Sequence, residues 1–121
     1  MANTFKVVTF AAEPNSAGTP YVVYTAGSGV TTVVLGLILT NINTAQVTAE
    51  VELVSDTSNR GGSNDVANGT AFLAKDIPIP VGSSVELLSG NKVVLETTDQ
   101  IRIDCSVADK LSGSLSIMEI T

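Results

Sequence analysis

The sequence contains no histidine, no tryptophan and a single cysteine among its 121 residues. Histidine is the side chain that most often transfers protons in enzymes near neutral pH, and it is the commonest metal ligand. A single cysteine excludes an internal disulfide and a metal site built from several cysteines. We therefore expect a protein that is not an enzyme and that holds no catalytic centre, cofactor or metal.

Charged residues are also scarce, at 15% of the chain, and twelve acidic residues against six basic ones give a net charge of -6. Phosphate backbones repel such a surface, and the basic residues are scattered rather than clustered, so nucleic acid is not an expected partner. The shortage of charge leaves two interpretations open. Neighbouring subunits cover part of the surface, or uncharged polar side chains coat it.

Long hydrophobic runs are missing as well. The longest, Val33 to Leu39, is far too short for a membrane-spanning helix. The first residues, Met1 to Lys6, lack the basic start and apolar stretch of a secretory signal. We expect a soluble chain that is synthesised in the cytoplasm of a host cell and has no membrane partner.

Val, Ile, Leu and Thr are abundant, and they recur with the two-residue period of β-strands. Turn-forming residues separate the candidate strands, which are residues 5–10, 21–24, 31–43, 46–54, 71–80, 85–88, 93–95, 101–107 and 113–120. About eight short strands of this kind predict an all-β, antiparallel β-sandwich of the jelly-roll kind, with a closed barrel as the alternative. No change of composition divides the chain, so we expect one domain over residues 1–121, with residues 1–20 as a possible arm that contacts a partner.

Three segments carry more specific expectations. Residues 31–43 are apolar on both alternating sets, with Val33, Leu35, Leu37 and Leu39 on one and Val34 and Ile38 on the other. Such a strand is covered on both faces or lies in a subunit contact. Residues 101–107 point Ile101, Ile103, Cys105 and Val107 inward. The prolines of Ile77-Pro-Ile-Pro80 place their strand at a sheet edge or at its exit into a loop.

The last strand begins its inward set with Leu115 and Ile117, whereas Met118 and Ile120 belong to the other set. This change of side predicts either a β-bulge near the C-terminus or a contact on the outer face.

Several segments together resemble a family of small virion proteins of tailed bacteriophages. They are residues 33–42, 75–84 (Lys-Asp-Ile-Pro-Ile-Pro-Val-Gly-Ser-Ser), 87–96 (Leu-Leu-Ser-Gly-Asn-Lys-Val-Val-Leu-Glu) and 98–102. The resemblance covers roughly residues 20–121 and consists of strand and turn signals. It implies a β-sandwich subunit on the outside of a particle, either a capsid decoration (cement) protein or part of a tail or fibre. It supplies no catalytic residues.

Four groups of residues invite a chemical interpretation, and each has a plainer one. Cys105 alternates in phase with apolar residues, which favours a small buried side chain over an activated thiol. Glu50 and Glu52 are interpreted as an acidic stripe rather than a cation site, because Ca²⁺ needs about six oxygens from several segments. The loop 56–65 has Arg60 where a calcium loop needs an oxygen, so we interpret it as a surface linker rather than a calcium site. The Ser-rich turns at 82–84 and 110–113 show no spacing that selects a Ser–Lys nucleophile pair.

We therefore predict a homo-oligomeric virion protein, with a trimer favoured, on the outer surface of the particle. Its partners are the major capsid protein or another virion protein. The residues expected to make the contacts are Asn3, Thr4, Phe5, Lys6, Val7, Asn59, Arg60, Asn64, Met118 and Ile120. The rival prediction is a tail, baseplate or fibre component that recognises the host surface, although two Tyr and three Phe offer few aromatic platforms for a glycan. An enzyme on a cupin-like barrel would need a histidine-rich metal site.

Overall fold

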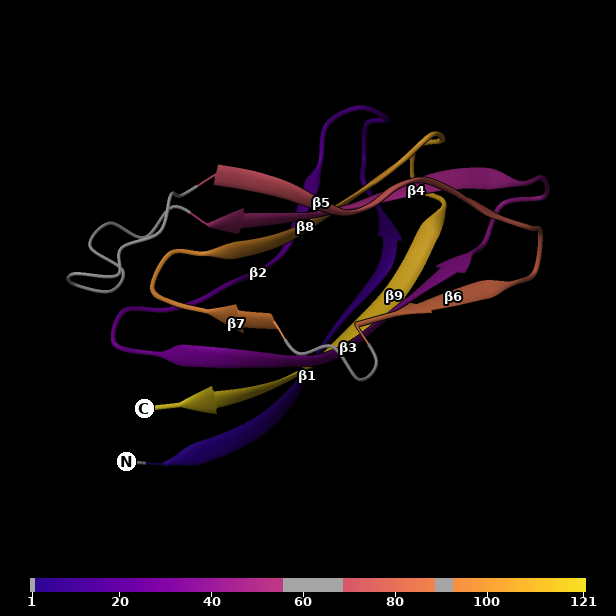
Figure 1. Ribbon diagram of the computed structural model, residues 1–121. Coiled ribbons are helices and arrows are strands. Elements are labelled where there is room, and N and C mark those ends of the chain that lie inside the picture. Colours follow the sequence, from indigo (N-terminus) through magenta and orange to yellow (C-terminus); the bar gives the residue numbers. More distant parts are fainter. Residues whose placement is uncertain (1, 56–68, 89–92) are drawn as a thin grey trace.

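Two layers of antiparallel strands form the protein in the computed structural model, which describes residues 2–55, 69–88 and 93–121 (Figure 1). The strands of these residues are β1 (Asn3–Glu13), β2 (Tyr21–Thr25), β3 (Thr31–Asn41), β4 (Val47–Ser55), β5 (Gly69–Ile79), β6 (Ser84–Leu87), β7 (Val93–Leu95), β8 (Gln100–Cys105) and β9 (Leu111–Ile120). The described part of the chain has no helix of the length and apolarity needed to cross a membrane.

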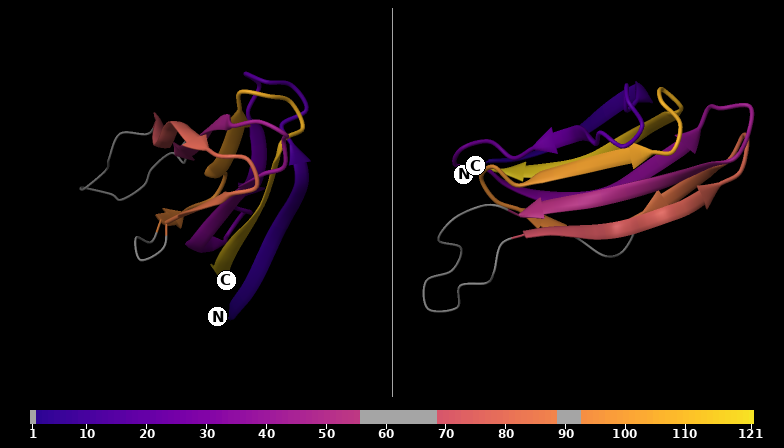
Figure 2. Two further views of the ribbon diagram at one scale, coloured as in Figure 1. Left: turned by 90° about the vertical axis from the view of Figure 1, so that its right-hand side faces the viewer. Right: turned by 90° about the horizontal axis from the view of Figure 1, so that it is seen from above.

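The strand order is that of a jelly roll. One sheet runs β1–β9–β3–β6, with β7 also paired to β3, and the other runs β2–β8–β4–β5. β6 and β7 pair with different ends of β3, so these two short strands share one edge position. The chain passes back and forth between the two sheets, which lie face to face in Figure 2. The predicted jelly-roll-like β-sandwich is therefore confirmed.

The core fills the space between the sheets and follows the two-residue alternation of the strands. From the first sheet it takes Val34, Leu37, Leu39, Leu115 and Ile117, and from the second Val47, Ala49, Val51, Ile101 and Ile103, all of them almost fully buried. Cys105 is buried among them, as its phase predicted. The strand predicted at residues 46–54 forms as β4, which buries Val47, Ala49 and Val51.

The alternation predicted for residues 31–43 is wrong in its first half. Val34 and Leu37 both point into the core, although residues three positions apart in a regular strand point to opposite faces. The register of β3 against β9 explains this: Val34 pairs with Ile117 and Gly36 with Ser116, so Leu35 is an extra residue. This β-bulge reverses the phase and turns Val33 to the outer face. Pairing along β9 is unbroken between Asn3↔Ile120 and Phe10↔Gly113, so β9 itself has no bulge near Met118.

Two further expectations about strand ends have different outcomes. Val107 does not point inward: β8 ends at Cys105, and Val107 lies in the following turn with 37% of its surface exposed. β5, which contains Pro78, is an edge strand as its prolines predicted.

Residues 3–13, placed within a possible arm, form β1, which pairs with β9 and buries Phe10 in the core.

Candidate interaction surface

A row of apolar side chains crosses the outer face of the first sheet. Phe5 of β1 pairs with Met118 of β9, Met118 with Val33 of β3, and Val33 with Val94 of β7. Directly opposed residues of antiparallel strands point to the same face, so these four side chains form one line. Phe5 is 72% exposed and Val94 is 48% exposed. We call these four residues the apolar row.

The apolar row has neighbours of the same kind on its own face. Val7, two residues after Phe5 on β1, is 63% exposed. Ile120, two residues after Met118, pairs with Asn3 and Thr31. Phe5 and Val7 are the most exposed large hydrophobic residues in the part of the chain that the structure describes. An exposed apolar surface of this kind is typical of a contact site on a soluble protein.

The structure brings half of the predicted contact residues together and separates others. Asn3, Phe5, Val7, Met118 and Ile120 lie on adjacent positions of β1 and β9 and share the outer face. Thr4 and Lys6 point to the opposite face of β1, and Lys6 is held there by an ion pair to Glu119 at 2.7 Å. Asn59, Arg60 and Asn64 lie outside the described residues. Val33 and Val94 were not predicted, because only the pairing of distant strands places them beside Met118.

A polar cluster under this face fixes β1 to the rest of the fold. The hydroxyl of Tyr24 in β2 donates to Glu119 Oε2 at 2.6 Å and lies 2.8 Å from Thr32 Oγ1 of β3. Burial, reinforced by the hydrogen bond to Glu119, raises the pKa of Tyr24 to about 12. The ammonium of Lys6 and then the Tyr24 hydroxyl lower the pKa of Glu119. This cluster links four strands, so we assign Lys6 a structural role.

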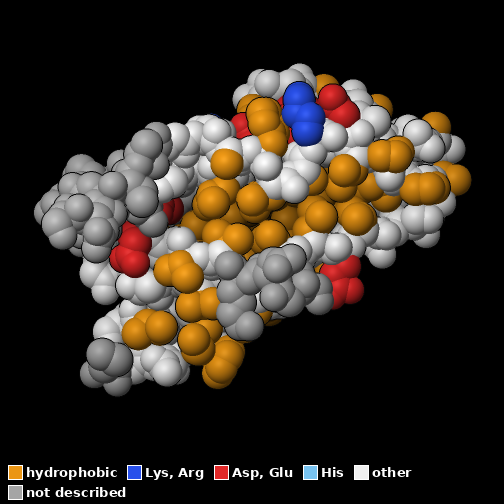
Figure 3. Space-filling model, in the orientation of Figure 1, with side chains coloured by type: hydrophobic (Ala, Val, Ile, Leu, Met, Phe, Trp, Pro, Cys, Tyr) orange, Lys and Arg blue, Asp and Glu red, His pale blue; other side chains and the backbone are white. Residues whose placement is uncertain are grey.

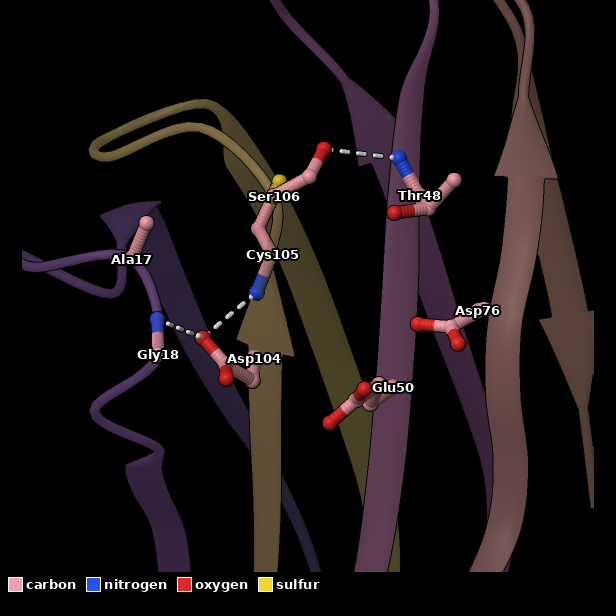
Figure 4. Close-up of a pocket in the computed structure, with 8 residues that line it drawn as sticks. All are labelled: Ala17, Gly18, Thr48, Glu50, Asp76, Asp104, Cys105 and Ser106. Atoms are coloured by element: carbon pink, nitrogen blue, oxygen red, sulfur yellow. Dashed lines mark hydrogen bonds between the residues drawn. The ribbon is translucent and has the colours of Figure 1, made fainter.

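The outer face of the second sheet carries a hollow of different character (Figure 4). It has a volume of about 360 Å³ and is lined by Ala17, Gly18, Thr48, Glu50, Asp76, Asp104, Cys105 and Ser106. Its carboxylates have partners within the protein. Glu50 forms an ion pair with Lys75 at 2.7 Å. Asp104 Oδ1 accepts from the backbone N–H groups of Gly18 at 3.1 Å and Cys105 at 2.8 Å.

These contacts give the acidic residues of the hollow a structural role. Asp104 holds the loop at Gly18, and Glu50 links β4 to β5 through Lys75. No group of three or more His, Cys, Asp or Glu side chains within residues 2–55, 69–88 and 93–121 is arranged to hold a metal ion. Burial raises the pKa of the Cys105 thiol, so its sulfur stays protonated and is a poor nucleophile at neutral pH.

Hydrophobic side chains also lie along the seam between the two sheets. Figure 3 views the edge at which β5 faces β6 and β7, and shows these side chains gathered between the strands. The partly buried hydrophobic residues of β5, β6 and β7 that pack against the core include Leu73, Ile77, Val85, Leu87 and Val93. We interpret the seam as the open edge of the sandwich core.

Comparisons with known proteins support the fold and go no further. No family model and no curated protein matches the sequence. Among solved structures, a chain in the structure of the infectious bursal disease virus Gx strain superposes with a TM-score of 0.50 at 14% identity. The match covers 98% of this protein and 33% of that chain, so this protein spans about a third of its length. At this identity the likeness shows a shared fold.

Proposed function

We propose that this protein is a virion structural protein, a decoration subunit that binds the outer surface of an assembled bacteriophage head and stabilises it. The observation that carries the proposal is the apolar row, Phe5–Met118–Val33–Val94, on a sheet whose other face is anchored in the core. A rigid sheet presents these side chains with little cost for ordering the backbone on binding, so more of the free energy of covering them appears as affinity. Covering an apolar side chain of this size completely contributes up to about 3 kcal/mol.

The distribution of charge supports a defined orientation on the particle. The acidic hollow lies on the outer face of the second sheet, whereas the apolar row lies on the outer face of the first. With the apolar row against the shell, Glu50 and Asp76 remain on the side that faces water, where carboxylates are well hydrated. We propose the major capsid protein as the partner of the apolar row.

Stabilisation would follow from mass action. A subunit that binds the assembled shell but not its separated parts lowers the free energy of the assembly by its binding free energy. A contact of about 800 Å² per partner suffices for a specific complex, and repetition over the shell multiplies the effect. The sequence resemblance to bacteriophage virion proteins supports this role, and the fold shared with a chain from a virus is compatible with it.

The test compares particles of the virus that encodes this chain with particles from which the gene is deleted. We expect the deleted particles to lose infectivity at a lower temperature, and we expect the purified protein to restore resistance when it is added back. Equal heat resistance with and without the protein would refute the decoration role. Labelling by antibody at the tail instead of the head would favour the rival tail or fibre role.

A further inference from the structure

The sandwich has four sheet edges, at β1, β2, β5 and the shared position of β6 and β7. An edge strand presents unpaired backbone N–H and C=O groups that readily pair with another chain. Soluble proteins therefore protect their edges with prolines, bulges, charges or very short strands. The four edges of this protein differ in this respect.

Three of the edges carry such protection. β5 contains Pro78, has register shifts against β4, and holds Asp76 at a φ of 52°. β2 is only 5 residues long and has a register shift between Val22 and Tyr24. β6 and β7, with 4 and 3 residues, divide their edge into two short pieces.

β1 is the exception. It has 11 residues, contains no proline, and keeps an unbroken register with β9 from Asn3 to Phe10. Its only basic residue, Lys6, forms an ion pair with Glu119 of the same chain. Both Figure 1 and Figure 2 show β1 at the margin of the molecule, with no other strand beyond it.

The hydrogen-bonding pattern identifies the free backbone groups of β1. Ala2 and Thr121 exchange two backbone hydrogen bonds, of 3.1 and 3.0 Å. Hydrogen-bonded and non-hydrogen-bonded residue pairs alternate along an antiparallel ladder. Because Ala2 belongs to a hydrogen-bonded pair, the backbone N–H and C=O groups of the even-numbered residues of β1 face β9. Those of Asn3, Phe5, Val7 and Thr9 consequently face away from the sheet. Their side chains lie on the same outer face as the apolar row.

We propose that β1 of one copy pairs antiparallel with β1 of a second copy across a twofold axis, so that their first sheets join into one continuous sheet. Two features favour a second copy over a foreign strand. A strand paired with itself about a twofold axis closes after two copies and satisfies the same backbone groups on both sides. Residues 3–12 contain a single charge, at Lys6, so the contact brings little like-charge repulsion despite the net charge of -6.

The side chains select a register centred on Val7. In this register Val7 lies opposite Val7 of the second copy and Phe5 lies opposite Thr9, which are β-branched and aromatic pairs that stabilise sheets. Lys6 lies opposite Val8, whereas a register shifted by one step would place the two lysines face to face. The apolar rows of both copies then flank the twofold axis on one surface.

This inference rests on the geometry of β1 and does not require the virion role. The contact closes at two copies, so it predicts a dimer where the sequence analysis favoured a trimer. The decisive measurement is the mass in solution, by sedimentation equilibrium, of the full chain and of two variants. Val7→Lys places a cation on the twofold axis. Val22→Lys is the matched control, an exposed valine on the edge strand β2 of the other sheet.

We expect the wild type and Val22→Lys to have twice the chain mass of 12.4 kDa, and we expect Val7→Lys to dissociate with at least a tenfold higher Kd. Circular dichroism checks that both variants remain folded. If Val7→Lys unfolds, Thr9→Pro replaces it, because this proline removes a free N–H group and leaves the bonds to β9 intact. A monomeric or trimeric wild type, or a dimer that Val7→Lys and Thr9→Pro both leave intact, overturns the proposal.

The two proposals fail separately. A monomer that still protects particles against heat overturns the β1 dimer and leaves the decoration role standing. A dimer that gives particles no protection overturns the decoration role and leaves the β1 dimer standing.

Discussion

At the scale of single residues, Gly113 shows how closely β9 is packed. A Cβ atom at this position would lie 2.5 Å from the carbonyl oxygen of Ile38 and 2.6 Å from Cζ of the Phe10 ring. We expect Gly113→Ala to lower the free energy of unfolding by about 1–3 kcal/mol, because neither the backbone oxygen nor the buried ring has room to move. Urea unfolding measures this change.

Gly36 is the matched control for Gly113, since it lies on the neighbouring strand β3 and a Cβ atom there meets nothing within 4 Å. Gly36→Ala should change the stability by no more than about 1 kcal/mol and should stabilise if anything. Equal losses in the two variants would contradict the packing described around Phe10.

The cluster of Lys6, Tyr24 and Glu119 predicts a dependence of stability on pH. The folded state lowers the pKa of Glu119, so the unfolded state binds more protons as the pH falls. The stabilisation is therefore present at neutral pH and lost on acidification below the ordinary glutamate pKa of about 4.3. We expect Glu119→Gln to cost about 1 kcal/mol at pH 7 and less at pH 3.

Urea unfolding of the wild type and Glu119→Gln at both pH values measures this difference. A cost that stays constant between pH 7 and pH 3 would show that the carboxylate charge of Glu119 contributes nothing.

At the scale of elements, the strands follow from the sequence wherever alternation is regular. Residues 46–54 and the inward pair Leu115 and Ile117 were placed correctly, because a two-residue period and a core on one face determine them. The extra residue Leu35 could not be foreseen, since a bulge depends on the partner strand β9 and leaves no local signal.

The same reasoning explains which contact residues were found. Met118 and Ile120 could be proposed because they belong to the outward set of their strand, whereas Phe5 and Val7 were proposed as part of an N-terminal arm. Joining them to Val33 and Val94 required knowledge of which distant strands pair, and the apolar residues on both alternating sets of residues 31–43 did not show which of them face outward. The loop 56–68 contributes no test, because it lies outside the described residues.

Leu37 and Ile38 test the phase of β3 after the bulge. Leu37 is fully buried, whereas Ile38 is 42% exposed. Leu37→Ala should cost about 2–5 kcal/mol of stability by opening a cavity, and Ile38→Ala should cost less than about 1 kcal/mol. Chemical unfolding of both variants measures the difference, and comparable losses would mean that the phase assigned to β3 is incorrect.

At the scale of the whole molecule, the two outer faces of the sandwich differ in chemical character. One face presents the apolar row, and the other presents an acidic hollow in which Asp104 holds the loop at Gly18 and Glu50 pairs with Lys75 of the neighbouring strand. The polar cluster around Glu119 and the close packing at Gly113 both fix β1 and β9, the strands that carry Phe5 and Met118. Residues that stabilise the fold therefore also keep the proposed contact surface rigid.

The central claim is that the apolar row is the surface that meets the particle. The direct measurement is cosedimentation of purified Val94→Lys and Val22→Lys variants with assembled heads that lack the protein. Both valines are exposed, but only Val94 lies on the apolar row. We predict that Val94→Lys binds at least tenfold more weakly than the wild type and that Val22→Lys binds within about twofold of it, because a desolvated lysine costs more than 1.4 kcal/mol. Undiminished binding of Val94→Lys, or a greater loss for Val22→Lys, would contradict the account.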